Sequence, residues 1–111
     1  MKIFYIYDSH LGGVYVTDRE LTRDEEYCDQ CGDFDVLIFS GSVVDIHEHY
    51  ENQITCASRW KTFWRNKGNM DKECDYAYDL ECLLIEYKQV LDELESQGNR
   101  PYYFDFKKYE D

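Results

Sequence analysis

The chain has 111 residues, and its 24 acidic and 12 basic side chains give a formal net charge of −12. Phosphate groups are bound by Lys and Arg, so this charge disfavours nucleic acid or an anionic membrane as a direct partner and favours a basic protein. Aromatic residues make up 17% of the chain, more than a disordered chain carries, and we expect one folded domain over residues 1–111.

The N-terminal residues and the number of cysteines indicate in which cellular compartment the protein resides. The first apolar run is short and meets Asp8, so we expect no secretory signal, and no window is long and apolar enough for a transmembrane helix. The chain has five cysteines, an odd number that cannot all pair in disulfides within one chain. Since we also expect no secretory signal, we expect these cysteines to be reduced thiols. The sequence therefore predicts a cytoplasmic protein.

The first predicted elements are strands. Residues 2–7 and 14–17 are rich in β-branched and aromatic side chains, and the paired glycines of "DSHLGG" between them suit the tight turn of a hairpin. Residues 18–35 are polar and acidic without a clear period, which predicts a loop with a local knuckle. Residues 36–40, "VLIFS", predict a third strand.

Two long helices are predicted next. The first has Ser42 as its N-cap, with Asp45 completing a partial capping box, and ends at Gly68; the second runs from about Asp71 to Gln97. Apolar residues recur at steps of three and four, the spacing of one helical face. The two predicted faces are Val43, Ile46, Tyr50, Ile54, Ala57, Trp60 and Trp64, and Ala77, Leu80, Leu84, Tyr87, Leu91 and Leu94.

A last strand is predicted over residues 102–106, "YYFDF", which Pro101 separates from the second helix. The pattern as a whole predicts an α+β fold, in which a small antiparallel sheet packs on two α-helices. The sheet would contain the N-terminal hairpin, the third strand and this C-terminal strand.

Asp8 and His10, two residues apart after an apolar strand, are placed as metal ligands often are. Together with "FSGSVVD" (39–45) and "GNMD" (68–71), they resemble the first three motifs of the calcineurin-like metallophosphoesterases, which implies a two-metal hydrolase. Ser42, however, stands in place of the metal-bridging Asp, Met70 replaces the motif His, and no His follows residue 49. We expect at most a degenerate member, with Asp8 and His10 bonded to backbone groups of the turn.

"YCDQCGD", residues 27–33, has the form of one zinc knuckle, which supplies two ligands of the four that a structural site needs. A zinc site that joins Cys28 and Cys31 with His47, His49 or a later cysteine stays open beside the simpler hypothesis, a polar turn with two reduced thiols. No other cofactor is expected. The surrounding acids should raise the thiol pKa, which disfavours a redox role.

Charge is segregated along the chain. Residues 1–51 carry a net charge of −9, residues 52–70 carry +4, and residues 71–111 carry −7. On the second helix, acids at steps of four and seven form one stripe about 6 to 10 Å apart, similar to the spacing of phosphates along a nucleic acid. The stripe consists of Asp75, Asp79, Glu86 and Glu93. An ordinary solvated helix face is the alternative.

The basic stretch 52–70 interleaves cations with Trp60, Phe63 and Trp64. Such a pattern can bind nucleic acid, but Trp60 and Trp64 fall on the apolar face, so we expect core packing. The cations would then complement the acidic loop within the fold or between two copies, which leaves a homodimer open.

Within residues 4–39, "YIYDSHLGGVYVTD" and "YCDQCGDFD" resemble small acidic accessory proteins of bacteriophages of Gram-positive bacteria. The resemblance implies an anti-defence protein in the host cytoplasm, as in the anti-CRISPR proteins that mimic DNA. We therefore expect a non-enzymatic inhibitor that occupies the basic nucleic-acid channel of a host defence protein, such as a CRISPR effector. Its contacts would be the four acids of the stripe, then Asp24, Glu25 and Glu26. The alternatives are a zinc-stabilised interaction module without a catalytic role and, third, a degenerate metallophosphoesterase.

Overall fold

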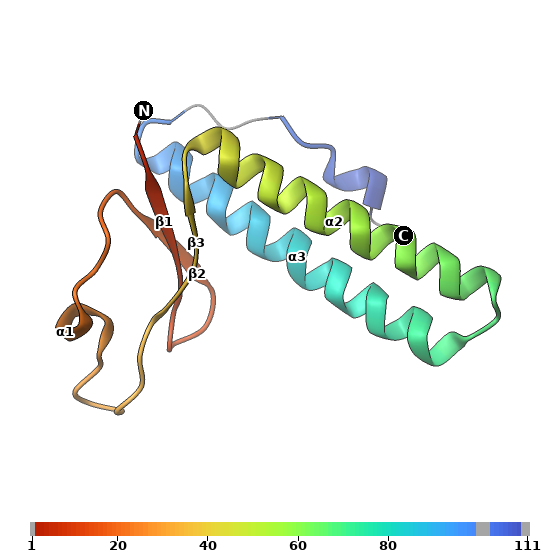
Figure 1. Ribbon diagram of the computed structural model, residues 1–111, viewed down its shortest axis with the longest axis horizontal. Coiled ribbons are helices and arrows are strands. Elements are labelled where there is room, and N and C mark those ends of the chain that lie inside the picture. Colours follow the sequence, from red (N-terminus) through yellow and green to blue (C-terminus); the bar gives the residue numbers. More distant parts are fainter. Residues whose placement is uncertain (1, 100–102, 110–111) are drawn as a thin grey trace.

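A computed structural model describes residues 2–99 and 103–109 and has a small sheet at one end of a long helix pair (Figure 1). The sheet consists of β1 (Phe4–Asp8), β2 (Val14–Thr17) and β3 (Val36–Gly41). The helix pair consists of α2 (Val43–Asn66) and α3 (Met70–Ser96). The predicted α+β class, an antiparallel sheet with two long helices, is confirmed.

The sheet has the strand order β2-β1-β3, and both pairs are antiparallel. The hairpin turn is closed by hydrogen bonds from the Ser9 amide to the Gly13 carbonyl (2.9 Å) and from the Gly12 amide to the Ser9 carbonyl (3.0 Å). Gly12 and Gly13 have φ angles of +95° and +79°, which explains the paired glycines. A register shift after Ile6 accompanies the burial of both Ile6 and Tyr7.

Side-chain caps begin both long helices. At α2, the Ser42 hydroxyl accepts a hydrogen bond from the Asp45 amide (3.2 Å), and the Asp45 carboxylate accepts one from the Ser42 amide (3.1 Å). This is the predicted capping box, and it is complete. At α3, the Asn69 side chain accepts from the Lys72 amide (3.1 Å). In the described part of the chain, neither these helices nor the short ones combine the length and apolar character of a membrane span.

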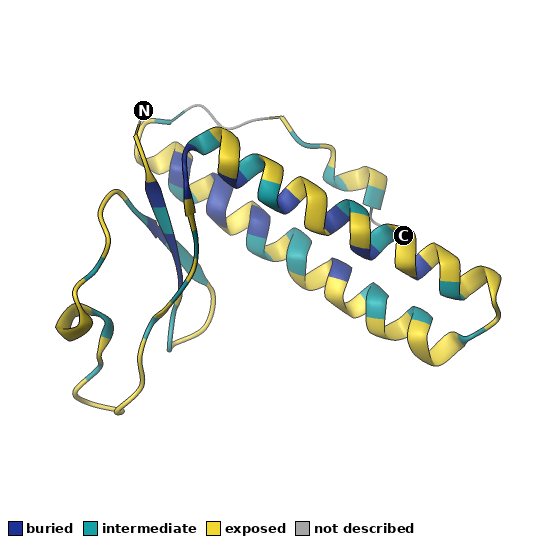
Figure 2. Cartoon of the chain, viewed as in Figure 1, coloured by how far each residue is buried: buried dark blue, intermediate teal, exposed yellow. Residues whose placement is uncertain are grey.

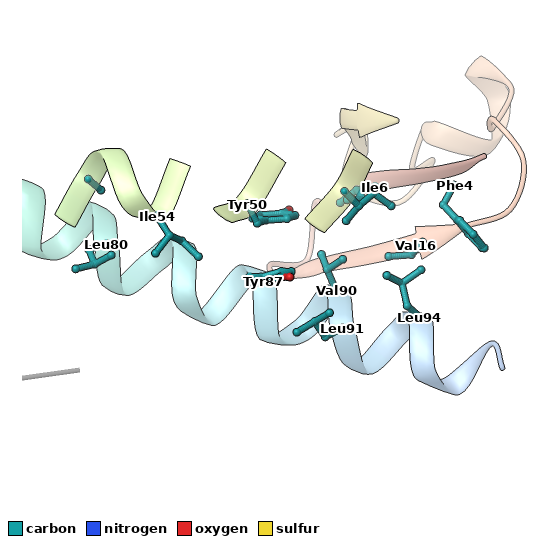
Figure 3. Close-up of a cluster of buried hydrophobic side chains, with 12 residues drawn as sticks. Phe4, Ile6, Val16, Tyr50, Ile54, Leu80, Tyr87, Val90, Leu91 and Leu94 are labelled. Atoms are coloured by element: carbon teal, nitrogen blue, oxygen red, sulfur yellow. The ribbon is translucent and has the colours of Figure 1, made fainter. Parts of the chain in front are cut away.

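The hydrophobic core lies where the sheet covers the helix pair (Figures 2 and 3). Tyr50 of α2 and Tyr87 of α3 are fully buried at its centre, with their rings stacked at a centroid distance of 5.0 Å. Because the helices extend past the sheet, their distal turns are mostly exposed (Figure 2). The buried cluster consists of Phe4, Ile6, Val16, Ile46, Tyr50, Ile54, Ala57, Leu80, Tyr87, Val90, Leu91 and Leu94.

The prediction that Trp60 packs in the core is wrong. Its side chain is 43% exposed, and the neighbouring Lys61 is buried instead. Trp60 lies in the distal half of α2, beyond the sheet (Figure 1), and its ring lies over Tyr76 of α3 at 6.1 Å. Trp64 is half-buried, and the Lys72 ammonium lies 4.3 Å from its ring.

The predicted C-terminal strand is also wrong where the structure describes it. Residues 103–105 belong to no strand, and a 3₁₀ helix, η1, spans Phe106–Tyr109. Residue 102 lies outside the described residues. Phe104 and Phe106 place their rings 5.1 and 5.8 Å from Tyr87, so the segment packs on the helix pair and not on a sheet edge (Figure 1).

We expect the substitution Gly41→Ala to lower the free energy of unfolding by about 1–3 kcal/mol, the usual cost of overpacking. A Cβ at this junction of β3 and α2 would lie 2.7 Å from the Asp45 Cβ and 3.3 Å from the Phe39 ring. Asp45 cannot retreat without losing its bond to Ser42. Urea denaturation measures the change, and Ser40→Ala, at an exposed position of β3, is the matched control with less than about 0.5 kcal/mol expected.

Candidate functional site

The four acids of the predicted stripe lie along one side of α3 and are named here the acidic edge. Asp75 and Asp79 are exposed, whereas Glu86 and Glu93 are half-buried. Within the described residues, none of the four forms an ion pair. Across residues 2–99 and 103–109, these four carboxylates therefore have no ion-pair partner, and all four are at least partly exposed.

Asp79 and Glu86 also line a groove of about 440 Å³ between α2 and α3. Its walls include the rings of Trp60 and Tyr76, which lie nearly parallel, with an interplanar angle of 20°. Carboxylates accept charge-assisted hydrogen bonds from Arg or Lys, and an aromatic face attracts the same cations. The groove therefore suits a basic side chain of a partner.

Glu86 adjoins the buried core as well. Burial raises the pKa of Tyr50, and the charge of Glu86 adds to this effect. The Tyr50 hydroxyl is buried without a hydrogen-bond partner of good geometry among the described residues. The Tyr50 phenol therefore stays neutral beside the Glu86 carboxyl group at the edge of the groove.

The predicted loop acids Asp24, Glu25 and Glu26 all lie in α1 (Arg23–Glu26). Glu25 is occupied within the fold: it caps α1 by accepting from the Thr22 amide (3.1 Å), and it pairs with Arg19. The hydrogen bond from Arg19 lowers the pKa of Glu25 to about 2. α1 lies beyond the sheet and away from α3 (Figure 1), so these acids and the acidic edge do not form one surface.

A second group consists of His10, Cys28 and Cys31, named here the thiol–imidazole cluster. One potential ligand atom from each lies within 4.8 Å of the others. The knuckle that holds the thiols is closed by bonds from the Cys28 amide to the Asp33 carbonyl and from the Gly32 amide to the Cys28 carbonyl, both 2.8 Å. The φ of Gly32 is +75°, a conformation that favours glycine at this place in the turn.

Asp35 orients the imidazole of this cluster. One of its carboxylate oxygens accepts from the His10 backbone amide (2.9 Å) and lies 2.6 Å from His10 Nδ1, while the other accepts from the Tyr15 hydroxyl. The hydrogen bond to Asp35 raises the pKa of His10. His10 was predicted to bond to backbone groups of its own turn, and the structure corrects this, because its partner is 25 residues away.

The two thiols differ in acidity. The Cys31 backbone amide lowers the pKa of Cys28, against the predicted rise from neighbouring acids. For Cys31, the Asp33 amide acts to lower the pKa, but the hydrogen bond with Cys28 and burial outweigh it, so the pKa of Cys31 is raised. The knuckle therefore makes Cys28 the more acidic of the two thiols.

The structure does not bring the predicted ligands His47 and His49 to the thiols. His47 bonds to the Tyr87 hydroxyl and lies 3.0 Å from Glu51, and His49 stacks on Phe39 at 4.1 Å. Among the described residues, the cluster has His10 as its third member. In the sequence, the signal for this third member is the Asp-x-His pair of Asp8 and His10, which lies 18 residues before the first thiol of the knuckle.

The three phosphoesterase-like motifs do not converge. Asp8 pairs with Val36 at one end of the sheet, whereas Gly41, next to Ser42, pairs with Phe4 at the other end. Met70 begins α3 at the far end of the helix pair (Figure 1). Asp8, Ser42 and Met70 therefore do not share one metal site.

Comparison of the chain with protein-family models, with curated proteins and with solved structures finds no match.

Proposed function

We propose that this protein is a non-catalytic inhibitor that acts in the cytoplasm of a bacterial host of phage. Its acidic edge would occupy a basic nucleic-acid-binding surface of a defence protein, such as the channel of a CRISPR effector. The observation that supports this function is that Asp75, Asp79, Glu86 and Glu93 lie on one side of α3 without ion pairs among the described residues.

The geometry of α3 suits this mimicry. At about 1.5 Å per residue, the acidic edge extends for about 27 Å along a rigid helix. A rigid row of charges loses little conformational entropy on binding, whereas a flexible acidic tail would lose more. Complementary charge would also steer the encounter and make association fast and sensitive to salt.

The groove beside the acidic edge would add selectivity. Trp60 and Tyr76 offer ring faces next to Asp79 and Glu86. An Arg from the partner could stack on a ring and donate to a carboxylate, and such buried Arg contacts tend to dominate interface energies. Glu25, which its own Arg19 neutralises, would contribute little.

The experiment compares two variants that each remove four negative charges. D75N/D79N/E86Q/E93Q removes the acidic edge, and E48Q/E81Q/D92N/E95Q removes four exposed acids from elsewhere on α2 and α3. Displacement of target DNA from purified CRISPR effector–guide RNA complexes is measured by fluorescence anisotropy at about 50 and 200 mM salt.

We expect the acidic-edge variant to bind about 30-fold more weakly, since four partly exposed charge pairs at about 0.5 kcal/mol each amount to about 2 kcal/mol. The control variant should lose much less. If both variants lose the same affinity, net charge alone causes the binding and the acidic edge has no special role. If the acidic-edge variant binds as tightly as the wild type, the proposal is wrong.

The thiol–imidazole cluster favours a second candidate, a small zinc-stabilised interaction module without a catalytic role. The two candidates are separable, because one depends on carboxylates of α3 and the other on His10, Cys28 and Cys31, which are not part of α3. The phosphoesterase alternative receives no support from motifs that lie so far apart.

A further inference from the structure

Residues 18–35, named here the α1 lobe, fold without a hydrophobic core. No residue between 18 and 35 is buried, and the lobe projects beyond the sheet (Figures 1 and 2). Its main apolar contact joins Tyr27 and Phe34, whose backbones form an isolated bridge and whose rings lie 4.9 Å apart. Small units that bury so little apolar surface usually depend on a disulfide or a metal ion.

We propose that His10, Cys28 and Cys31 bind a zinc ion, which links the α1 lobe to the hairpin turn. The three ligand atoms already lie within 4.8 Å of one another. In a tetrahedral site, Zn–S bonds of about 2.3 Å and Zn–N bonds of about 2.0 Å place neighbouring ligand atoms about 3.5 to 3.8 Å apart. Small side-chain rotations are therefore enough to form the site.

The surroundings of His10 match those of a zinc-bound histidine. Such a histidine usually directs its second ring nitrogen to a carboxylate, which sets the tautomer and the ring orientation. Here Nδ1 bonds to Asp35 at 2.6 Å, so Nε2 is the nitrogen left for a metal. Asp35 is held by the Tyr15 hydroxyl in turn. The imidazole is therefore oriented before metal binds.

The donor set favours a transition metal such as zinc over Mg²⁺ or Ca²⁺. Two thiolates and one imidazole suit a borderline-soft ion, whereas Mg²⁺ and Ca²⁺ require oxygen ligands. The fourth position of a tetrahedral ion goes to water or to a donor from another molecule. Cys31 is exposed, so such a donor can approach.

The test uses untagged protein purified without added zinc. Metal content is measured by mass spectrometry, and Co²⁺ replaces zinc so that its visible spectrum reports thiolate ligands. We expect about one zinc per chain and the absorption of a tetrahedral site with two thiolates. C28S/C31S should lose both signals, whereas C56S/C82S, which removes two exposed cysteines outside the cluster, should keep them.

Asp35 provides an independent readout as a positioning residue. D35N should lower zinc affinity about 10- to 100-fold, while E20Q, which changes an exposed acid elsewhere in the α1 lobe, should leave it unchanged. Circular dichroism checks that α2 and α3 remain folded in each variant. Protein without zinc, a Cys28–Cys31 disulfide in freshly isolated protein, or equal zinc loss in C56S/C82S would each overturn the proposal.

Discussion

Replacing Tyr87 by alanine is expected to lower the free energy of unfolding by about 3–5 kcal/mol, the cost of truncating a buried aromatic side chain. Tyr87 is fully buried and joins three parts of the fold. Its ring stacks on Tyr50 of α2 and contacts Phe104 and Phe106 of the C-terminal segment, and its hydroxyl bonds to His47. Its loss would leave a cavity where these parts meet.

Two further variants separate the causes of this effect. Tyr87→Phe keeps the ring and removes the hydroxyl, so it should cost only about 0.5–1.5 kcal/mol. Tyr78→Ala removes an exposed ring from the same helix and should cost less than about 0.5 kcal/mol. Urea denaturation followed by circular dichroism measures all three. A loss for Tyr87→Ala no larger than that for Tyr78→Ala would contradict the packing described here.

Chelation of zinc is expected to open the α1 lobe while the helix pair stays folded. Zinc at a free concentration of about 100 times its Kd would suppress opening of the lobe about 100-fold. The amide hydrogens of the lobe should therefore exchange with solvent about 100-fold faster once zinc is removed. Because no residue of the lobe is buried, little apolar burial opposes this opening, and the remaining contacts are polar ones such as those of Asp35 with His10 and Tyr15. Hydrogen exchange with mass spectrometry compares peptides from residues 18–35 and 80–94 before and after EDTA.

The C28S/C31S variant is the control for this measurement. Its lobe should exchange fast from the start and show no response to EDTA. If wild-type exchange in residues 18–35 is unaffected by the chelator, no metal holds the lobe. If residues 80–94 respond equally, the metal stabilises the whole fold and not the lobe.

The two proposals can fail separately, since their residues lie at different places. The acidic edge is on α3, and the thiol–imidazole cluster joins the hairpin turn to the α1 lobe (Figure 1). A zinc-free C28S/C31S variant should still bind a basic partner through α3. If it does not, the α1 lobe takes part in the interface.

Features with a local cause were predictable from the sequence. The capping box of Ser42 and Asp45 forms between residues three apart, and the hairpin turn depends on the positive φ of Gly12 and Gly13. Apolar spacing of three and four residues predicted both long helices and most of their buried positions. The spacing of acidic residues in the sequence of α3 also predicted that one side of this helix is acidic, because the helical period determines which residues share a face.

Features that depend on distant contacts were decided by the tertiary structure alone. Trp60 has core spacing, but it is exposed because the sheet covers only part of the helix pair. Phe104 and Phe106 have the alternation of a strand, yet their rings pack on Tyr87 of α3, and residues 103–109 form no strand.

The thiol–imidazole cluster shows the same division between local and distant causes. The sequence by itself determined an α+β chain with an acidic helix and a knuckle that holds two thiols. It did not determine that His10 would be the third member, because Asp35 holds it there across 25 residues. Spacing along the chain determines local geometry, whereas a pairing between distant residues exists only after the chain has folded.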